Sequence, residues 1–204
     1  MKNLKFAFID ALLLTQNGFY HSDFFAISTA QLTRTLGDYR SLFPEQIEYS
    51  HAKRRYIPKA DFKGALIPGN TTNERKENAK KFRAIMNAFK GDFKMMQGAY
   101  LESLIISKGH FDITDLMETF GLSKPQITRD IAAYKKAHPK QVSHFGKTRG
   151  YEALIHFEAQ TLSLLDDRYG KRSTKDKKAK LCIEDISFLR QIDEGTADTI
   201  LNCV

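Results

Sequence analysis

The sequence has few cysteines and no long apolar segment. Only two of its 204 residues are cysteine, Cys182 and Cys203, and they do not form a CxxC pair. This excludes a zinc finger or a disulfide framework and favours a reducing location. The apolar N-terminal stretch is interrupted by Asp10 and precedes no cleavage pattern, and no run approaches the length of a membrane span. We therefore expect a cytoplasmic protein, associated with neither export nor a membrane.

Sequence motifs that support catalysis are also missing. There is no phosphate-binding glycine loop, no nucleophile elbow and no group of carboxylates at metal-binding spacing. The six histidines form no HxxxH or HExxH set. The sequence thus predicts a protein that is not an enzyme, with no catalytic residue, no metal site and no cofactor.

Positive charge is in excess. Lysine and arginine number 32 against 24 aspartates and glutamates, which gives a formal net charge of +8. Such a balance favours a polyanionic partner but does not distinguish DNA from RNA or an acidic membrane surface. With 42% hydrophobic and 27% charged residues, the chain has the composition of a folded protein and the length for two small domains.

The chain contains an internal repeat. Residues 27–56 align without a gap on residues 122–151 at a constant offset of 95, with nine identical pairs, where chance predicts about two. Before these segments the repeats need a gap of four residues, about one helical turn. We therefore expect the second helix of the first copy, around residues 21–26, to be shortened relative to the second copy.

Each copy shows the pattern helix, helix, turn, helix, hairpin. The third helices begin at Ser28 and Ser123, each followed three residues later by glutamine, which predicts a capping box. They end before Pro44 and Pro139, since a residue that precedes proline is driven out of the α region. A strand, a basic turn and a second strand follow, which is the pattern of a wing.

The predicted fold is mainly α with small β wings. Two tandem winged helix-turn-helix domains occupy residues 1–68 and 92–158. Residues 69–91 are assigned to a connector. The domain boundary is expected at a cluster of helix breakers, residues 68–73, and the helix that follows it carries an apolar stripe, which predicts that it is packed. Residues 159–204 are expected to form a basic loop and a helical tail.

The tail is predicted to contain two short helices separated at Gly195, and an apolar stripe marks its first part. The stripe consists of Ile183, Ile186, Leu189 and Ile192. One interpretation is a homodimer interface, which is common in helix-turn-helix proteins. The other is that the stripe covers the winged helix of its own chain.

Both copies resemble the N-terminal winged helix-turn-helix of the WYL-domain transcriptional regulators that control phage-defence loci. The first copy matches at Phe8, Ile9, Asp10, Ile27, Ser28, Gln31, Tyr39, Pro44, Ile47, Tyr49, Tyr56, Pro58 and Phe62. The second matches at Leu122, Ser123, Gln126, Asp130, Tyr134, Pro139 and Tyr151. The chain departs from the family where Gln46 and Gln141 replace an asparagine, and no WYL domain follows. The resemblance implies DNA binding and repression.

The third helix of a helix-turn-helix enters the major groove with its N-terminal residues towards the bases. Arginine can contact guanine, and glutamine adenine, through two hydrogen bonds. The candidate DNA-binding residues on the first helix are Ser28, Thr29, Gln31, Thr33 and Arg34. On the second they are Ser123, Lys124, Gln126, Thr128 and Arg129. The wings add Lys53, Arg54 and Arg55 in the first copy, and Lys147 and Arg149 in the second.

Each of these assignments has a structural alternative. The two glutamines can serve only to close capping boxes, the two arginines can clamp phosphate, and the wing cations can be solvated turns. The basic run at residues 171–180 can add phosphate affinity or be a solvated loop.

The sequence predicts a sequence-specific double-stranded DNA-binding regulator, a repressor from a bacterial, phage or mobile-element source, located at the nucleoid. The alternative is a plasmid or phage replication initiator, whose two winged-helix domains bind iterated origin repeats. A third interpretation makes the first domain an interaction module that has lost its DNA contacts.

Overall fold

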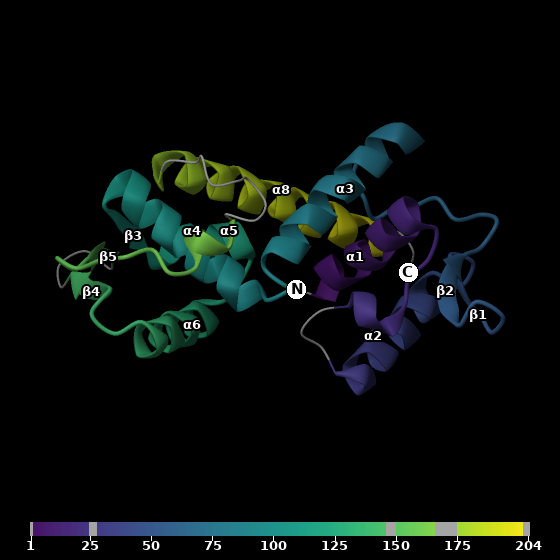
Figure 1. The fold of residues 1–204 in the computed structure, drawn as a ribbon, viewed down its shortest axis with the longest axis horizontal. Helices are drawn as coiled ribbons and strands as arrows, with labels where there is room; N and C mark the ends of the chain where they lie inside the picture. Colours follow the sequence, from purple (N-terminus) through teal and green to yellow (C-terminus); the bar gives the residue numbers. More distant parts are fainter. Residues whose placement is uncertain (1, 25–27, 146–149, 166–174, 202–204) are drawn as a thin grey trace. The chain divides into compact units, whose positions relative to one another are not determined.

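The structure is a computed structural model that describes residues 2–24, 28–145, 150–165 and 175–201. The chain divides into two compact units (Figure 1). The first comprises Met1–Gly91 together with Leu189–Val204, and the second comprises Asp92–Phe188. Each unit contains a helix-turn-helix followed by a hairpin, so the predicted fold class is confirmed.

The first unit carries its hairpin between the second and third α-helices of the chain. Its elements are α1 (Lys2–Gln16), the 3-10 helix η1 (His21–Asp23), α2 (Thr29–Leu42), β1 (Ile47–Ser50), β2 (Arg55–Pro58) and α3 (Thr72–Ala88). The strands pair antiparallel, with Tyr49 opposite Tyr56. Phe19, after α1, forms an isolated antiparallel bridge with Tyr56, which attaches the hairpin to the start of the helix-turn-helix.

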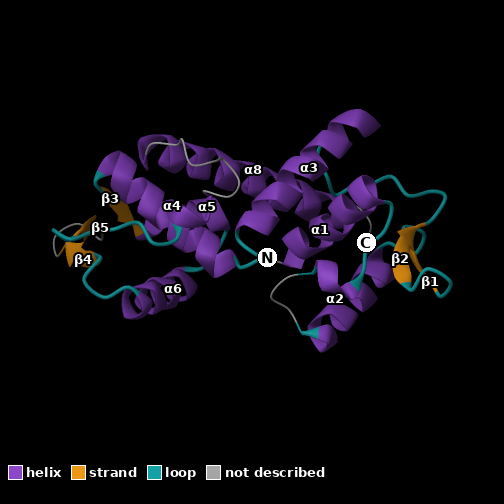
Figure 2. Ribbon diagram, viewed as in Figure 1, coloured by secondary structure: helices purple, strands orange, loops and turns teal. Residues whose placement is uncertain are grey.

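The second unit repeats this order with a longer second helix and a third strand. Its elements are α4 (Phe93–Lys108), β3 (His110–Asp112), α5 (Ile113–Phe120), α6 (Lys124–Ala137), β4 (Val142–Phe145), β5 (Gly150–Ala153) and the 3-10 helix η2 (Leu162–Leu165). The strands, orange in Figure 2, form an antiparallel sheet in the order β3-β5-β4. Phe111 lies opposite Tyr151 in this sheet, as Phe19 lies opposite Tyr56 in the first unit.

The predicted apolar stripes form the cores of the two units. Those of α1 and α4 are buried at Phe6, Ile9, Leu13, Phe93, Met96, Tyr100 and Leu104. Those of α2 and α6 are buried at Leu32, Leu36, Tyr39, Ile127, Ile131 and Tyr134. Burying a side chain of this size stabilises the fold by about 1.5–3 kcal/mol, so each third helix is held by its inner face while its opposite face stays in solvent.

The shortened second helix of the first copy is confirmed. The three residues of η1 stand where the second unit has the eight residues of α5. The ring of Phe24 is buried beside this short helix, with its centroid 5.2 Å from that of Phe8 and 5.6 Å from that of Phe19. Aromatic packing thus fills part of the volume that a longer helix would occupy.

Helix α3 belongs to the first unit and does not stand apart as a connector. Its predicted stripe, Phe82, Ile85, Met86 and Phe89, is buried, and the ring of Phe82 packs edge-to-face on Phe8 of α1 at 6.0 Å. Gly91, at a φ of 66°, donates its amide hydrogen to the carbonyl of Met86 over 2.7 Å and ends the segment. The units therefore meet in sequence between residues 91 and 92, not within the breaker cluster at 68–73.

The C-terminal segment differs from its prediction in two ways. It is one helix, α8 (Lys175–Leu201), which passes through Gly195. The predicted helix break at Gly195 was wrong, because glycine destabilises a helix by only about 1 kcal/mol relative to alanine. In addition, the part of the basic run from Lys175 to Lys180 is helical and not a loop, whereas Lys171 and Arg172 lie outside the described residues.

The apolar stripe of α8 is buried within the chain. Ile186, Leu189 and Ile192 are at most 4% exposed, and the hydroxyl of Thr196 donates to the carbonyl of Leu66 over 3.3 Å. Three of the four side chains that the sequence assigned to a dimer interface are thus covered, whereas Ile183 is half-exposed.

None of the helices described is both long and apolar enough to cross a membrane. Within the described ranges of the chain, no three histidine, cysteine, aspartate or glutamate side chains are grouped as a metal site would need.

Candidate nucleic-acid interface

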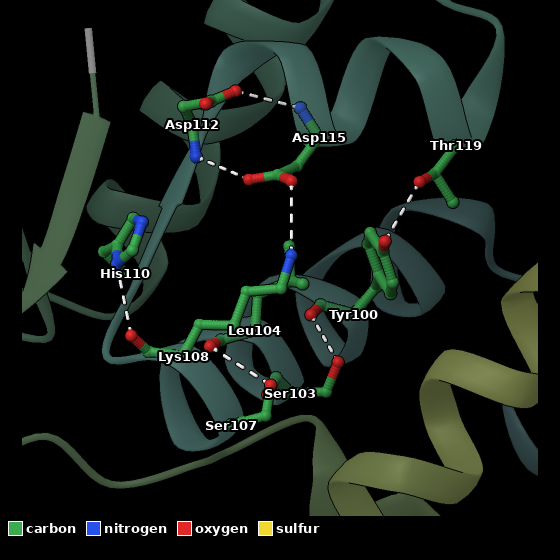
Figure 3. A network of polar contacts seen from close by, with 9 residues as sticks. All are labelled: Tyr100, Ser103, Leu104, Ser107, Lys108, His110, Asp112, Asp115 and Thr119. Atoms are coloured by element: carbon green, nitrogen blue, oxygen red, sulfur yellow. Dashed lines mark hydrogen bonds and ion pairs between the residues drawn. The ribbon is translucent and has the colours of Figure 1, made fainter. Parts of the chain in front are cut away.

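In the second unit, polar contacts fix α5 on α4 (Figure 3). The hydroxyl of Thr119 donates to that of Tyr100 over 3.0 Å, and Lys108 Nζ lies 3.6 Å from Asp115 Oδ1. Asp112 caps α5 by accepting from the amide of Asp115 over 3.0 Å, and its own amide donates to the Asp115 carboxylate over 2.9 Å. Gly121 then turns the chain at a φ of 60°, a conformation that suits glycine. These contacts set the direction in which α6 leaves the turn.

A buried carboxylate holds each third helix from behind. In the first unit, Asp10 of α1 accepts from the hydroxyl of Tyr39 on α2 and, over 3.0 Å, from the amide of Leu66. Burial raises the pKa of Asp10 from its ordinary 3.8 to about 6, although the bonds from Tyr39 and Leu66 act in the opposite direction. The pKa of Tyr39 is raised well above its ordinary value by its own burial and by the neighbouring carboxylate.

In the second unit, a buried carboxylate of the first helix also binds the tyrosine of the third helix, and it accepts more hydrogen bonds than Asp10 does. Glu102 of α4 accepts from the hydroxyl of Tyr134 on α6 over 2.9 Å. Its carboxylate also accepts from the backbone amides of Gln160, Thr161 and Leu162, at 2.8 to 3.0 Å. The pKa of Tyr134 is raised by burial and then by the charge of Glu102.

The sequence analysis missed this pair of carboxylates. Asp10 was noted only as an interruption of an apolar run and as a position of the family motif, and Glu102 was not considered. The available signal was an acidic residue inside an apolar stretch of the first helix of both copies, followed 29 and 32 residues later by a tyrosine at one repeat position. Buried carboxylates need such partners.

The outer faces of α2 and α6 present the same side chains in the same conformation. The Arg34 Nε donates to the carbonyl of Ala30 over 3.3 Å, and the Arg129 Nε donates to that of Pro125 over 3.3 Å. The preceding threonines, Thr33 and Thr128, each donate to a carbonyl four residues earlier over 2.9 Å. The residues predicted for this face that are exposed are Ser28, Thr29, Gln31, Thr33, Arg34, Ser123, Lys124, Thr128 and Arg129.

Gln31 and Gln126 differ in whether their side chains are bonded to the start of their own helix. Gln31 closes the predicted capping box, because its amide donates to Ser28 Oγ over 3.2 Å and its Oε1 accepts from the Ser28 amide over 3.0 Å. The corresponding box at Ser123 does not form. There the amide of Gln126 donates to the Ser123 carbonyl over 3.0 Å, so the backbone takes the donor that the serine hydroxyl would use. The half-exposed side chain of Gln126 is therefore not tied to its own helix end.

A tyrosine joins each hairpin to its third helix. The Tyr56 ring stacks on Phe19 at 5.3 Å, and the Arg40 guanidinium of α2 lies 5.3 Å from its centroid. In the second unit, Tyr151 stacks on Phe111 at 5.0 Å and Lys135 Nζ of α6 lies 5.9 Å from its centroid. These cation–π contacts fix the wing relative to the helix. Arg40 and Lys135 occupy one repeat position and are exposed, and the sequence analysis did not select them.

The described wing tip is exposed and basic. Lys53 and Arg54 lie in the turn between β1 and β2, with Arg54 at a φ of 51°. Arg55 begins β2 and is half-buried, so it contributes less of its side chain to the tip than the sequence predicted. Lys147 and Arg149 lie outside the described residues.

Comparison with known families agrees with this geometry. The family model of the BrxR transcriptional regulator winged helix-turn-helix domain matches residues 3–74 and 95–169. These two segments include all the helix-turn-helix and wing elements of both units. Searches of curated proteins and of solved structures gave no match.

The chain therefore belongs to the family of BrxR transcriptional regulator winged helix-turn-helix domains. This is a DNA-binding class and not an enzyme class, and the resemblance inferred from the sequence is confirmed. In each unit, the outer face of the third helix, α2 or α6, together with its hairpin is accordingly the candidate DNA interface.

Proposed function

We propose that the protein is a sequence-specific regulator that contacts double-stranded DNA through both α2 and α6. The observation that carries the proposal is the matched, exposed threonine and arginine pair, Thr33 with Arg34 and Thr128 with Arg129. Each arginine is tied to its helix through Nε, which leaves the two terminal nitrogens as paired donors. Paired donors suit the O6 and N7 acceptors of guanine in the major groove.

The surrounding residues supply contacts to the DNA backbone. Ser28 and Ser123 stand at helix N-termini, where amide groups favour phosphate. Arg40 and Lys135, exposed at the other end of the same helices, add positive charge beside each wing. Lys53 and Arg54 extend the basic surface at the first wing tip. We assign the same role to Arg149, which aligns with Arg54 in the repeat, and to Lys147 close to it in the sequence. Such contacts position the protein without selecting a sequence.

The proposal includes repression, by occupation of a promoter in the cytoplasm of a bacterium, as part of a bacterial, phage or mobile-element locus. A homodimer would present four third helices to DNA, and because the apolar stripe of α8 is buried, it would have to form through another surface. We therefore treat the single chain, with two DNA-binding units, as the binding species.

The test is selection of binding sites from random duplex DNA with the full chain, followed by footprinting on the DNA that surrounds its gene. A selected sequence that occurs over the gene's own promoter, together with repression of a reporter placed behind it, supports the proposal. An iterated array away from any promoter would instead indicate a replication initiator. Absence of any enriched sequence would overturn sequence-specific binding.

A further inference from the structure

The second unit contains a cavity behind its third helix that is partly open to solvent, with the exposed Lys94, Ala133 and Ala137 in its lining. The cavity measures about 230 Å³ and lies between α4 and the inner side of α6. Its walls include Leu101 and Gly98 of α4, Leu116 of α5, and Ile127, Ile131 and Tyr134 of α6.

The first unit shows which group is missing from this cavity. Phe6 lies four residues before the buried Asp10, and Gly98 lies four residues before the buried Glu102, so the two positions correspond. The Phe6 ring is 1% exposed and packs on Tyr39 at 5.8 Å. At Gly98 there is no side chain, and a Cβ placed there would lie 3.2 and 3.3 Å from the side chain of Thr161 and 3.5 Å from the ring of Tyr134. Thr161 thus takes part of the space that the phenyl ring fills in the other copy, and the cavity beside Gly98 is the part left unfilled.

Within the described part of the chain, two buried polar atoms beside the cavity have no hydrogen-bond partner. These are Oε1 of Gln97 and Oγ1 of Thr161, in side chains that are 7% and 9% exposed and that line the cavity. An unsatisfied buried acceptor destabilises the fold. Nearly all such atoms in folded proteins are paired with protein, water or a ligand.

We propose that this cavity binds a small aromatic molecule of one or two rings that carries a hydrogen-bond donor, such as a hydroxyl or an aryl N–H. The aromatic class follows from the missing ring and from the size, because a cavity of about 150 Å³ already accepts benzene. The donor follows from Gln97 and Thr161, both of which can accept a hydrogen bond. An apolar pocket with a small number of correctly placed polar groups is typical of sites for small ligands.

The cavity also suggests a route of regulation, and this part rests on the proposed function. Ile127, Ile131 and Tyr134 contact the cavity from the same helix that carries Arg129 on its exposed face. A ligand that binds better to one position of α6 than to another would shift its population and so change DNA affinity.

The first experiment measures binding to the full chain in the absence of DNA, by nuclear magnetic resonance titration. The probes are two matched pairs, indole with indene and 2-naphthol with naphthalene, in which only one member has a donor. We expect saturable binding of the donor members, at least about tenfold tighter than their partners, with shifts at α4 and α6. Lack of saturable binding by all four, or equal affinity within both pairs, would overturn the proposal.

Variants of the lining test the assignment. Thr161→Val and Gln97→Met remove the two acceptors with little change of volume, and one or both should abolish the preference for indole over indene. The exposed Thr114→Val is the matched control and should keep it. If both acceptor variants retain the preference, the proposed polar contacts are wrong.

Filling the cavity provides a separate readout. In the double variant Gly98→Phe with Thr161→Ala, the alanine removes the two atoms that lie 3.2 and 3.3 Å from a Cβ at position 98. This variant should bind none of the probes; binding by a folded double variant would contradict the location. Indole should change affinity for the selected DNA in the wild type only. Indole binding without such a change would overturn the regulatory part and leave the ligand site intact.

Discussion

The hydroxyl of Tyr134, on the buried face of α6, the third helix of the second unit, donates to the carboxylate of Glu102 over 2.9 Å. The same carboxylate accepts from three backbone amides after the wing, so it ties α6 to α4 and to η2 at once. Asp10 does the same in the first unit with Tyr39 and the amide of Leu66. The repeat therefore preserves a buried polar anchor for each third helix, even though the acidic residue differs.

Removing one donor of this anchor should destabilise the protein. We expect Tyr134→Phe to lower the free energy of unfolding by about 1–3 kcal/mol, because it leaves a buried carboxylate with one fewer charge-assisted hydrogen bond. Urea denaturation measures the change. Tyr49→Phe, at an exposed tyrosine, is the control and should change stability by less than about 0.5 kcal/mol. Equal effects of the two substitutions would mean that the Tyr134 bond does not stabilise the fold.

The first unit predicts a pH dependence of stability. The pKa of Asp10 is raised from 3.8 to about 6 in the folded state by burial. Between these values the folded state holds a proton that the unfolded state has released, so the free energy of unfolding falls as pH rises. The loss is about 3 kcal/mol at 1.36 kcal/mol per pKa unit, and it is complete above about pH 6.

Asp10→Asn isolates this effect, because asparagine does not ionise. Other titrating groups cancel when the unfolding free energies of the two proteins are subtracted at each pH. The wild type should lose stability relative to the variant as the pH is raised from about 4 to about 7. A difference that stays constant over this range would show that the folded-state pKa of Asp10 is not raised.

Local patterns were sufficient for most of the fold. The capping box at Ser28 and the helix ends before Pro44 and Pro139 depend on residues within one turn of the chain, and the structure confirms them. The shortened helix at η1 followed from counting four missing residues. The family also followed from the sequence, because its motif lies in the third helix and wing of both copies.

Features that depend on distant residues or on backbone detail were not predictable. The carboxylate of Glu102 accepts a hydrogen bond from the amide of Thr161, which lies 59 residues later, and no local sequence pattern predicts this contact. The continuity of α8 through Gly195 depends on burial of its neighbours Ile192 and Thr196. At Ser123 the same Ser-x-x-Gln pattern as at Ser28 gives no capping box, because the amide hydrogen bonds to a carbonyl instead.

The proposed base contact predicts a loss of specificity. Arg129→Ala should weaken binding to the selected sequence by about 1–3 kcal/mol and relax the base preference at one position, because it removes a two-donor contact to guanine. Binding to random DNA should change less. Electrophoretic mobility assays on selected and random duplexes measure both. Equal losses on the two duplexes would identify Arg129 as a phosphate contact.

The matched variant Arg34→Ala tests the first unit in the same way. It should relax the base preference at a different position of the selected sequence. If Arg34→Ala changes neither affinity nor preference while Arg129→Ala changes both, the first unit does not contact DNA, and the interpretation as an interaction module is favoured.

The wing predicts an electrostatic effect that does not depend on sequence. Lys53→Ala should weaken binding to all duplexes alike and reduce the slope of log affinity against log salt by about one. Filter binding at several salt concentrations gives the slope. Lys76→Ala, an exposed lysine on α3 outside the candidate interface, is the control for net charge. The same slope for both variants would show that Lys53 does not contact the DNA backbone.

The two glutamines provide the most specific comparison, because they occupy one repeat position and differ only in how their side chains are held. Gln31 is bonded to the amide of Ser28, so Gln31→Ala should lower stability by about 0.5–1 kcal/mol and leave the base preference unchanged. Gln126 is not bonded in this way, so Gln126→Ala should leave stability unchanged and weaken discrimination at an adenine. Urea denaturation and site selection on both variants measure the two effects. A change of base preference in Gln31→Ala, or a stability loss without a change of preference in Gln126→Ala, would show that the capping geometry does not decide which glutamine contacts a base.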